Sequence, residues 1–114
     1  TVFDDIKDNF TIMKEEPFGP LVPILTFKTF DEVIERANDN DLGLCSYLYT
    51  NSMDKAHIGS EKLESGCVAV NTGVVAIAEA PFGGIKQTGY GREGGSGAIK
   101  DYLNVKYTHM GLKI

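Results

Sequence analysis

Residues 44–71, which read LCSYLYTNSMDKAHIGSEKLESGCVAVN, decide the fold. The apolar runs at the two ends of this stretch, residues 44–50 and 67–71, have the length of β-strands. Between them Ser52 can cap an α-helix, and Gly66 can end it. The inner face of that helix is expected to carry Met53, Ala56, Ser60 and Leu63. A strand, a helix and a second strand in this order predict a right-handed crossover between parallel strands.

A second unit of the same kind lies immediately upstream. Residues 21–27 form an apolar strand, and Thr29 with Glu32 makes a capping box at the start of a helix. The apolar positions of that helix, at helical spacing, are Phe30, Val33, Ile34 and Ala37. Strands that are apolar throughout predict an α/β fold, a parallel sheet with βαβ crossovers and helices on both faces. Ligands of such sheets bind beyond the carboxyl ends of the strands, where Asn71 and the loop after it are expected.

The composition is that of one small globular domain. The 114 residues are 42% hydrophobic and 24% charged, which is ordinary for such a domain. A formal net charge of −5 disfavours nucleic acid and anionic membranes as partners, and no apolar run has the length of a membrane span. Cys45 and Cys67 lie in apolar runs, so buried reduced thiols and a cytoplasmic location are expected. His57 and His109 are too scattered to indicate a metal site.

A glycine-rich segment, residues 81–97, reads PFGGIKQTGYGREGGSG. Glycine at this density excludes a helix or an ordinary strand and permits close approach to another surface. We expect a shaped loop rather than a linker, because Phe82, Ile85 and Tyr90 are costly to expose. Residues 89–94 match the G-x-G-x-x-G pattern of dinucleotide-binding folds, but no strand directly precedes them and no helix opens on the third glycine. We therefore reject that function for the pattern.

Two functions of other classes stay open for this part of the chain. The backbone N–H groups of residues 95–98 can bind a phosphate weakly if a helix begins there. The other function is an assembly module without chemistry. Ser96 can cap a third helix, with apolar positions at Ala98, Ile99, Tyr102 and Leu103. The extended pattern over residues 105–112 then predicts a terminal strand that frays or pairs outside the domain.

Residues 14–20 read KEEPFGP and form a rigid turn. Pro17 and Pro20 fix their own φ angles and move the preceding residues out of the α region. The turn therefore presents a carboxylate, Glu16, and an aromatic ring, Phe18, at a set geometry. From residue types alone we favour a structural turn, with Phe18 in the core and Glu16 in solvent.

The chain resembles the aldehyde dehydrogenase superfamily over essentially its whole length. The resemblance is carried by residues 14–20, Asn71 and residues 81–93, in the order and spacing of that family. Residues 70–73 and 91–94 are most similar to the succinate semialdehyde dehydrogenase branch. The resemblance implies the C-terminal part of a longer enzyme that assembles as a homo-oligomer, a dimer or a tetramer. It divides the chain into the end of the catalytic domain, the glycine loop with its helix, and an oligomerisation tail, at residues 1–87, 88–102 and 103–114.

The resemblance also implies roles for individual residues. Glu16 would hold the ribose hydroxyls of an NAD or NADP cofactor, and Phe18 would pack near the nicotinamide ring. Phe82 would wall the pocket around the reactive thiol, and Ala76 would line the substrate pocket. Arg92 would fix the subunit-contact region. The subunit contact itself would be made by a strand that includes Tyr107, Thr108, His109 and Met110.

Members of the family oxidise an aldehyde by attack of a cysteine thiolate, hydride transfer to NAD(P)+ and hydrolysis of the thioester. In the family that cysteine lies upstream of the turn at residues 14–20, so this chain would hold no catalytic residue and would be inactive alone. The implied substrate is a small semialdehyde, foremost succinate semialdehyde. Ala76 stands where the succinate semialdehyde branch usually carries a serine that binds the distal carboxylate. This departure keeps a neutral aliphatic aldehyde as the alternative substrate.

Overall fold

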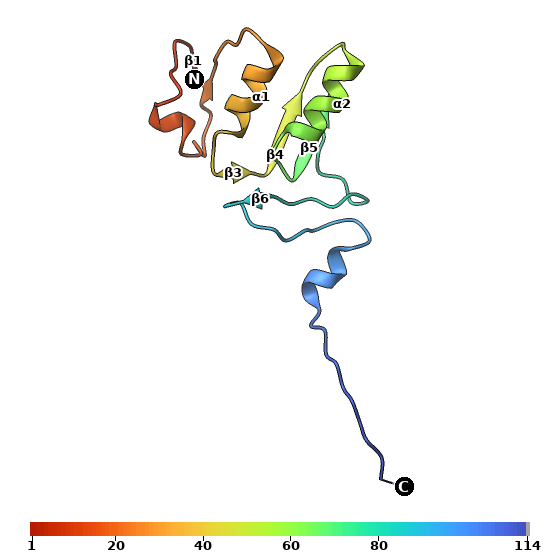
Figure 1. Cartoon of the computed structure of the whole chain (residues 1–114). Helices are drawn as coiled ribbons and strands as arrows, with labels where there is room; N and C mark the ends of the chain where they lie inside the picture. The colour runs from red at the N-terminus through yellow and green to blue at the C-terminus, as the bar shows by residue number, and fades with distance from the viewer. Residues whose placement is uncertain (114) are drawn as a thin grey trace.

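The computed structural model describes residues 1–113 as an α/β body with an extended C-terminal tail (Figure 1). Its strands are β1 (Val2–Phe3), β2 (Val22–Pro23), β3 (Leu42–Gly43), β4 (Cys45–Leu48), β5 (Cys67–Val70) and β6 (Ile85–Lys86). Its helices are the α-helices α1 (Phe30–Asn38) and α2 (Met53–Lys62) and the 3₁₀-helices η1 (Thr11–Met13) and η2 (Ala98–Tyr102). The α/β class expected from the sequence is confirmed.

The βαβ unit expected over residues 44–71 is also confirmed. β4 and β5 run parallel in the register that places Cys45 opposite Cys67, and α2 connects them. Ser52 caps α2, since its hydroxyl oxygen accepts a hydrogen bond from the N–H of Lys55 at 3.3 Å. The helix therefore begins where its capping residue predicts.

The inner face of α2 differs in part from the expected one. Met53 is 83% exposed and Ser60 is also exposed, so neither lies in the core. The buried position is Gly59, whose missing side chain lets α2 approach Leu48 of β4 and Phe30 of α1. A Cβ atom at Gly59 would lie 2.6 Å from Leu48 Cδ2 and 3.3 Å from Phe30 Cζ. Ala56 and Leu63, the other two expected positions, are half-buried and lie on the same side of the helix as Gly59. The expected face is therefore right for these two residues, and a search for apolar side chains at helical spacing overlooks the glycine between them.

The N-terminus of α1 is capped as the sequence predicts, except for one hydrogen bond. The side-chain oxygen of Thr29 accepts a hydrogen bond from the N–H of Glu32 at 3.2 Å, as in a capping box. The Glu32 carboxylate reaches one residue further back than expected and accepts from the N–H of Lys28 at 2.8 Å. That hydrogen bond lowers the pKa of Glu32. Ile34, on the face that the periodicity predicts, is 7% exposed and belongs to the core.

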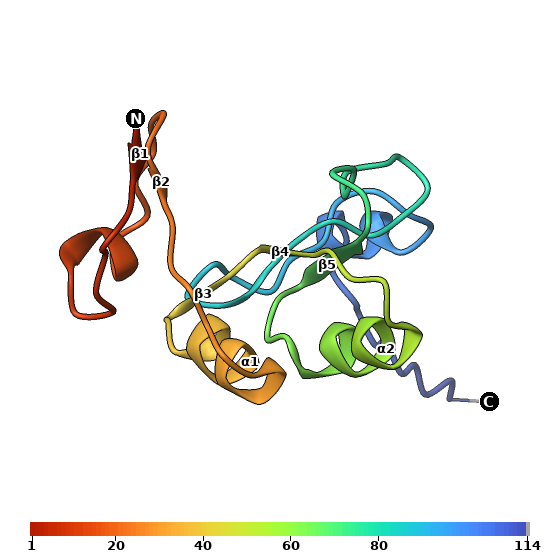
Figure 2. The ribbon, with the colours of Figure 1, turned by 90° about the horizontal axis from the view of Figure 1, so that it is seen from above.

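The expected single parallel sheet is wrong, because the strands form three two-stranded pieces. β2 pairs in parallel with β1, β4 pairs in parallel with β5, and β3 pairs with β6 in antiparallel orientation. The N–H of Val22 donates to the carbonyl of Thr1, and the N–H of Ile24 donates to the carbonyl of Phe3 in β1. Pro23, between them, would present its N–H on the other side of β2, but proline has no N–H. β2 therefore has no donor there for a further strand. Both α-helices lie on the same side of the strands rather than on both faces (Figure 2).

The glycine-rich segment contains a short strand and no α-helix. β6 pairs with β3, so the exclusion of a strand is wrong for two residues. Downstream, η2 replaces the expected third α-helix, and the N–H of Lys100 donates to the carbonyl of Gly97, three residues back, at 3.0 Å. Gly97 occupies the N-cap position, so Ser96 does not cap the helix. Gly94 and Gly95 have φ angles of 70° and 64°, which prevents a regular helix from beginning earlier.

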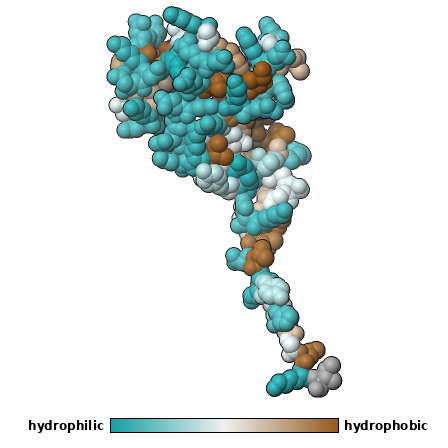
Figure 3. All heavy atoms as spheres, in the orientation of Figure 1, coloured by the Kyte–Doolittle hydropathy of each residue, from teal (hydrophilic) through white to brown (hydrophobic). Residues whose placement is uncertain are grey.

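The tail, residues 103–113, runs away from the body as an extended segment (Figure 1). It makes the molecule 78 Å long, against 33 and 24 Å in the other two directions. Apolar side chains along the tail are open to solvent (Figure 3), and Tyr107 and Leu112 are 84% and 88% exposed. Within residues 1–113 the tail pairs with no strand, and Ile114, the last residue of the expected oligomerisation tail, lies outside the described residues.

Candidate functional site

Main-chain hydrogen bonds hold the turn at residues 14–20. The N–H groups of Lys14 and Glu15 both donate to the carbonyl of Thr11, each at 2.9 Å, at the end of η1. On the other side of Glu16, the N–H of Gly19 donates to the carbonyl of Pro17 at 2.6 Å. The fixed φ of Pro17 lies between these bonds. The turn therefore holds the backbone of Glu16 in one position.

Glu16 lies on one wall of an open groove of about 400 Å³. Residues 42–46, which contain β3 and the start of β4, form the opposite wall together with Ser65. The Glu16 carboxylate is exposed, and within residues 1–113 it makes no hydrogen bond or ion pair. A carboxylate held in this way can accept hydrogen bonds from two neighbouring hydroxyl groups, such as those of a ribose. The groove is the candidate functional site.

Phe18 projects from the same turn and is 98% exposed. The interpretation from residue types, which places Phe18 in the core, is wrong. Pro17 and Pro20 hold this part of the turn away from the body, and no element within residues 1–113 covers the ring. An aromatic ring fully open to water is typical of a contact surface. Its position near a nicotinamide ring stays a prediction.

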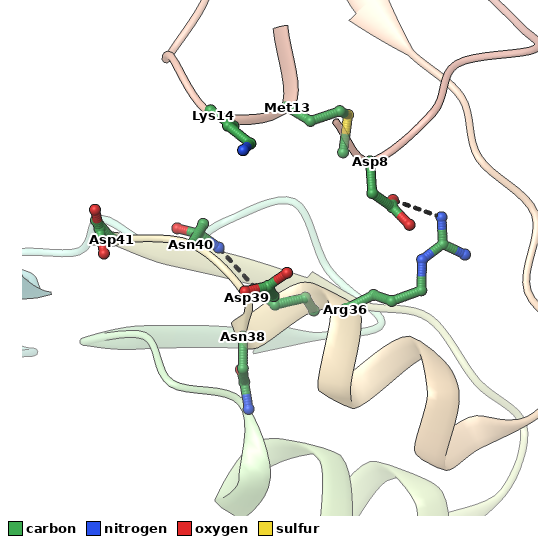
Figure 4. Close-up of a pocket in the computed structure, with 9 residues that line it drawn as sticks. Asp8, Met13, Lys14, Arg36, Asn38, Asp39, Asn40 and Asp41 are labelled. Atoms are coloured by element: carbon green, nitrogen blue, oxygen red, sulfur yellow. Dashed lines mark hydrogen bonds and ion pairs between the residues drawn. The ribbon is translucent and has the colours of Figure 1, made fainter. Parts of the chain in front are cut away.

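A second hollow, of about 580 Å³, adjoins the groove, since Met13, Lys14 and Asn40 line both (Figure 4). Asp8 and Arg36 meet at its edge, where Arg36 Nη2 lies 2.8 Å from Asp8 Oδ1. The hydrogen bond to Asp8 raises the pKa of Arg36. This ion pair ties the segment before the turn to α1. No local sequence pattern indicates it, because the two residues are 28 positions apart.

Asn71 lies beyond the carboxyl end of β5, as the sequence predicts, and its side chain joins β5 to the end of β4. Its Oδ1 accepts from the N–H of Thr50 at 2.9 Å, and its Nδ2 donates to the carbonyl of Thr50 at 2.9 Å. Its φ is 56°, in the left-handed region that Asn tolerates better than most residues with a Cβ. The side chain thus extends the pairing of β4 and β5 by one pair of hydrogen bonds.

Lys86 connects three segments, although no sequence pattern marks it as functional. Its Nζ donates to the carbonyls of Asn38 and Asn40 at 2.9 and 3.0 Å, at the C-terminal end of α1. It also forms an ion pair with Glu64 at 2.6 Å. Cations stabilise helix C-termini because the last carbonyl groups have no partner inside the helix. Lys86 therefore fixes β6, α1 and the turn before β5 relative to one another.

Arg92 holds the glycine loop in shape. Its Nη1 donates to three main-chain carbonyls, at 2.7 Å for Gly84, 2.9 Å for Tyr90 and 2.9 Å for Gly91. Phe82 and Glu93 also exchange two main-chain hydrogen bonds, 2.7 and 2.9 Å long. The glycine loop thus has a defined shape, as the sequence predicts, and hydrogen bonds from Arg92, itself part of the loop, stabilise it.

Within residues 1–113 the structure offers neither a strong phosphate site nor a metal site. The N–H of Gly95, one of the donors considered for phosphate, already donates to the carbonyl of Ala78 at 2.9 Å. No group of three or more His, Cys, Asp or Glu side chains in this range can hold a metal ion. No helix in the described chain combines the length and apolar character that a membrane crossing needs.

The other predicted site residues lie apart from the groove. Ala76 is exposed in the loop between β5 and β6, and Phe82 lines a separate hollow with Arg92. The four predicted subunit-contact residues are exposed in the tail: Tyr107, Thr108, His109 and Met110. Residues 1–113 therefore place Glu16 in the groove but do not join it with Ala76 or Phe82 in one cavity.

Comparison with known proteins identifies the family to which this architecture corresponds. The sequence profile of the aldehyde dehydrogenase family matches residues 1–108. The chain belongs to the aldehyde dehydrogenase family. The resemblance seen in residues 14–20, Asn71 and residues 81–93 is thereby confirmed.

Similarity extends to members of the family with different names. Succinate-semialdehyde dehydrogenase (NADP(+)) of Escherichia coli (strain K12) is 45% identical over 112 residues, which cover 98% of this chain and 23% of that protein. Retinaldehyde dehydrogenase 3 of Rattus norvegicus is 51% identical over 106 residues, 93% of this chain and 21% of that protein. The structure of an NAD+ complex of an aldehyde dehydrogenase from Bacillus cereus matches with a TM-score of 0.88 and 47% identity, over 92% of this chain and 21% of that chain. The chain spans about a fifth of the length of these relatives.

Proposed function

We propose that this chain forms the C-terminal part of an NAD(P)+-dependent aldehyde dehydrogenase that oxidises a small semialdehyde, foremost succinate semialdehyde, to the carboxylic acid. In this proposal the chain contributes a cofactor-binding carboxylate and a subunit-contact tail. The reactive cysteine belongs to a part of the enzyme that precedes residue 1. The observation that carries the proposal is Glu16, which a rigid turn holds over an open groove in a chain of this family.

The cofactor role of Glu16 is supported by charge and geometry. A bound NAD(P)+ accepts a hydride, so the nicotinamide has to be held at a fixed distance from the aldehyde carbon. A carboxylate that accepts hydrogen bonds from both ribose hydroxyls fixes the ribose next to that ring. Phe18, 98% exposed two residues further along the turn, offers an apolar surface beside it. NAD and NADP both fit this contact, because it involves only the ribose hydroxyls next to the nicotinamide.

The substrate proposal depends on Ala76, because overall similarity does not select a substrate. The E. coli relative is named for succinate semialdehyde and the rat relative for retinaldehyde, and both are similar to this chain. Ala76 lies in an exposed loop with Ile77, itself 51% exposed, beside it. An apolar surface here favours a neutral aliphatic aldehyde, whereas arginines elsewhere in the enzyme can still bind the distal carboxylate of a semialdehyde. A small semialdehyde is the leading proposal and a neutral aliphatic aldehyde the alternative.

The experiment for the substrate compares Ala76→Ser with the parent in the enzyme of full family length. A serine hydroxyl that reaches the distal carboxylate should raise kcat/KM for succinate semialdehyde relative to butanal by about 10- to 100-fold, since a hydrogen bond to a charged group contributes about 1.5 to 3 kcal/mol. Ala78→Ser, two residues along the same loop, is the matched control and should leave the ratio unchanged. An unchanged ratio in Ala76→Ser shows that Ala76 does not face the carboxylate.

The proposal also contains two statements about the chain by itself. It should oxidise no aldehyde, because the proposal assigns the reactive cysteine to the part of the enzyme upstream of this chain and gives Cys45 and Cys67, a pair on neighbouring strands, no catalytic role. Turnover above that of a heat-inactivated sample contradicts this.

The cytoplasmic location rests on these two cysteines, which are free thiols in the structure. An assembly module without chemistry remains the alternative function, and the exposed apolar tail is the observation that favours it.

A further inference from the structure

The two cysteines are direct neighbours across β4 and β5. The register places Cys45 opposite Cys67 and Ser46 opposite Val68. Paired residues on neighbouring strands point to the same face of a sheet, and successive residues point to opposite faces. Leu48 packs against α2 at Gly59, and Ser46, two residues before it, points to the same face of the sheet. The thiols of Cys45 and Cys67 therefore point to the opposite face.

The surroundings of the two thiols bring them together. Cys67 Sγ lies 3.6 Å from the carbonyl oxygen of Gly83, to which it donates, and both side chains are half-buried. Burial raises the pKa of the Cys45 thiol, and the adjacent Cys67 thiol raises it further. Cys45 is also one of the residues that line the groove with Glu16, and its side chain is only half-buried. The described chain thus holds two free, half-buried thiols side by side.

We infer that Cys45 and Cys67 form a dithiol that a hydroperoxide oxidises to a disulfide, a modification site on this chain. One thiolate attacks a peroxide oxygen, which breaks the O–O bond and gives a sulfenic acid and, with hydrogen peroxide, water. The second thiolate attacks the sulfenic sulfur, forms the S–S bond and releases a second water. The two thiols together lose two electrons and two protons, and the peroxide is reduced to water.

The backbone spacing allows this bond. Neighbouring strands lie about 4.8 Å apart, and disulfides join Cα atoms about 4.4 to 6.8 Å apart. The N–H of Cys67 donates to the carbonyl of Leu44 at 2.9 Å, which fixes the strands at the position of the pair. The disulfide would join β4 to β5 and close the chain around α2. It requires neither cofactor nor aldehyde, so it is independent of the proposed dehydrogenase activity.

The test treats the reduced chain with hydrogen peroxide under native conditions, followed by alkylation, digestion and mass spectrometry. Peptides that contain Cys45 and Cys67 should appear linked, with loss of two hydrogen atoms and of both alkylation sites, and a thiol reductant should reverse this. The rate should increase with pH, because the thiolate is the reactive form and the pKa of Cys45 is raised. The matched control exchanges two neighbours, Cys45→Ser with Ser46→Cys, which keeps the composition and turns one thiol to the α2 face.

The control should form the disulfide at least about tenfold more slowly than the parent in the native state, because it loses the alignment of the two sulfurs. In denaturing urea the two proteins should react at similar rates. Cys67→Ser should give a sulfenic acid at Cys45, which a dimedone probe detects even if the exchanged variant does not fold. The inference is wrong if the native parent yields no linked peptide, or if the exchanged variant, folded by circular dichroism, links as fast as the parent.

Discussion

Asn71 shows what the sequence reveals about a single residue and what it does not. Its place after an apolar run correctly predicts the carboxyl end of a strand. Its partner, Thr50, is not predictable, because the contact depends on the register of β5 against β4, which no local pattern fixes. The left-handed φ of Asn71 is also not predictable from the sequence, although Asn adopts such angles more readily than other residues with a Cβ.

Replacement of Asn71 should separate its hydrogen bonds from its backbone angle. Asn71→Ala removes both bonds to Thr50 and places a Cβ without compensation in the left-handed region, so the free energy of unfolding should fall by about 2 to 3 kcal/mol. Asn71→Gly removes the same bonds without the steric penalty and should lose about 1 kcal/mol less. Urea unfolding followed by circular dichroism measures both. Equal stability of the two variants shows that the φ of 56° contributes nothing.

In the turn at residues 14–20, residue types indicate the backbone conformation but not which side chains are buried. Two prolines predict a rigid turn, because the restriction on φ belongs to the residue itself, and the structure adds main-chain hydrogen bonds on both sides of Glu16. Residue type places Phe18 in the core, and this is wrong, since burial depends on which element covers the ring. The resemblance to the family implies another place for Phe18, near the nicotinamide ring, and this stays a prediction.

Among the elements, helices were more predictable than strand pairing. Thr29 and Ser52 cap α1 and α2, because a capping hydrogen bond spans only three residues. β2 and β4 do not pair, and Pro23 leaves β2 without an N–H donor on the side away from β1. The sequence shows that this N–H is missing but not to which side it would point. The contacts of Lys86 with the end of α1 bridge up to 48 positions and have no local signal.

An added methyl group at Gly66 should push the glycine loop away from the start of β5. A Cβ there would overlap the carbonyl oxygen of Gly83, where the glycine loop crosses the start of β5. The oxygen belongs to the main chain, and the backbone fixes the position of a Cβ atom, so a rotamer change cannot relieve the overlap. Gly66→Ala should lower the free energy of unfolding by about 1 to 3 kcal/mol.

The matched control for this change is Gly97→Ala. A Cβ at Gly97 would have no neighbour within 4 Å, and its backbone is in the right-handed helical region. This variant should be neutral or gain up to about 1 kcal/mol by restricting the unfolded chain. Thermal unfolding of the two variants side by side decides the matter. Equal midpoints contradict the close crossing at Gly66.

At the scale of the whole molecule, the tail is the feature without an explanation inside the body. Apolar side chains such as Tyr107 and Leu112 are more than four-fifths exposed, at 84% and 88%, which is costly unless another surface covers them. The sequence predicts a terminal strand here, and the structure has an extended segment that pairs with no strand within residues 1–113. Its pairing with a neighbouring subunit remains a prediction.

Removal of residues 107–114 should lower the oligomeric state of the full-length enzyme, because an inter-subunit strand pairing is lost. Thr108→Pro should have the same effect without shortening the chain, since it removes a ladder N–H. Thr108→Ala keeps that N–H and should assemble as the parent does. Sedimentation velocity measures all three. An unaltered profile after truncation identifies the tail as an ordinary frayed end.

The central claim is that the turn at residues 14–20 holds Glu16 against the cofactor of a dehydrogenase. The most direct measurement is the single-turnover rate of hydride transfer in the full-length enzyme, followed by the absorbance of NAD(P)H, for Glu16→Gln. Gln keeps the shape but removes the charge, so the cofactor should be misplaced and the rate should fall by about 10-fold or more. Glu35→Gln, exposed on α1 outside the groove, should leave it unchanged. An unchanged rate in Glu16→Gln contradicts the claim and shows a carboxylate that is merely solvated.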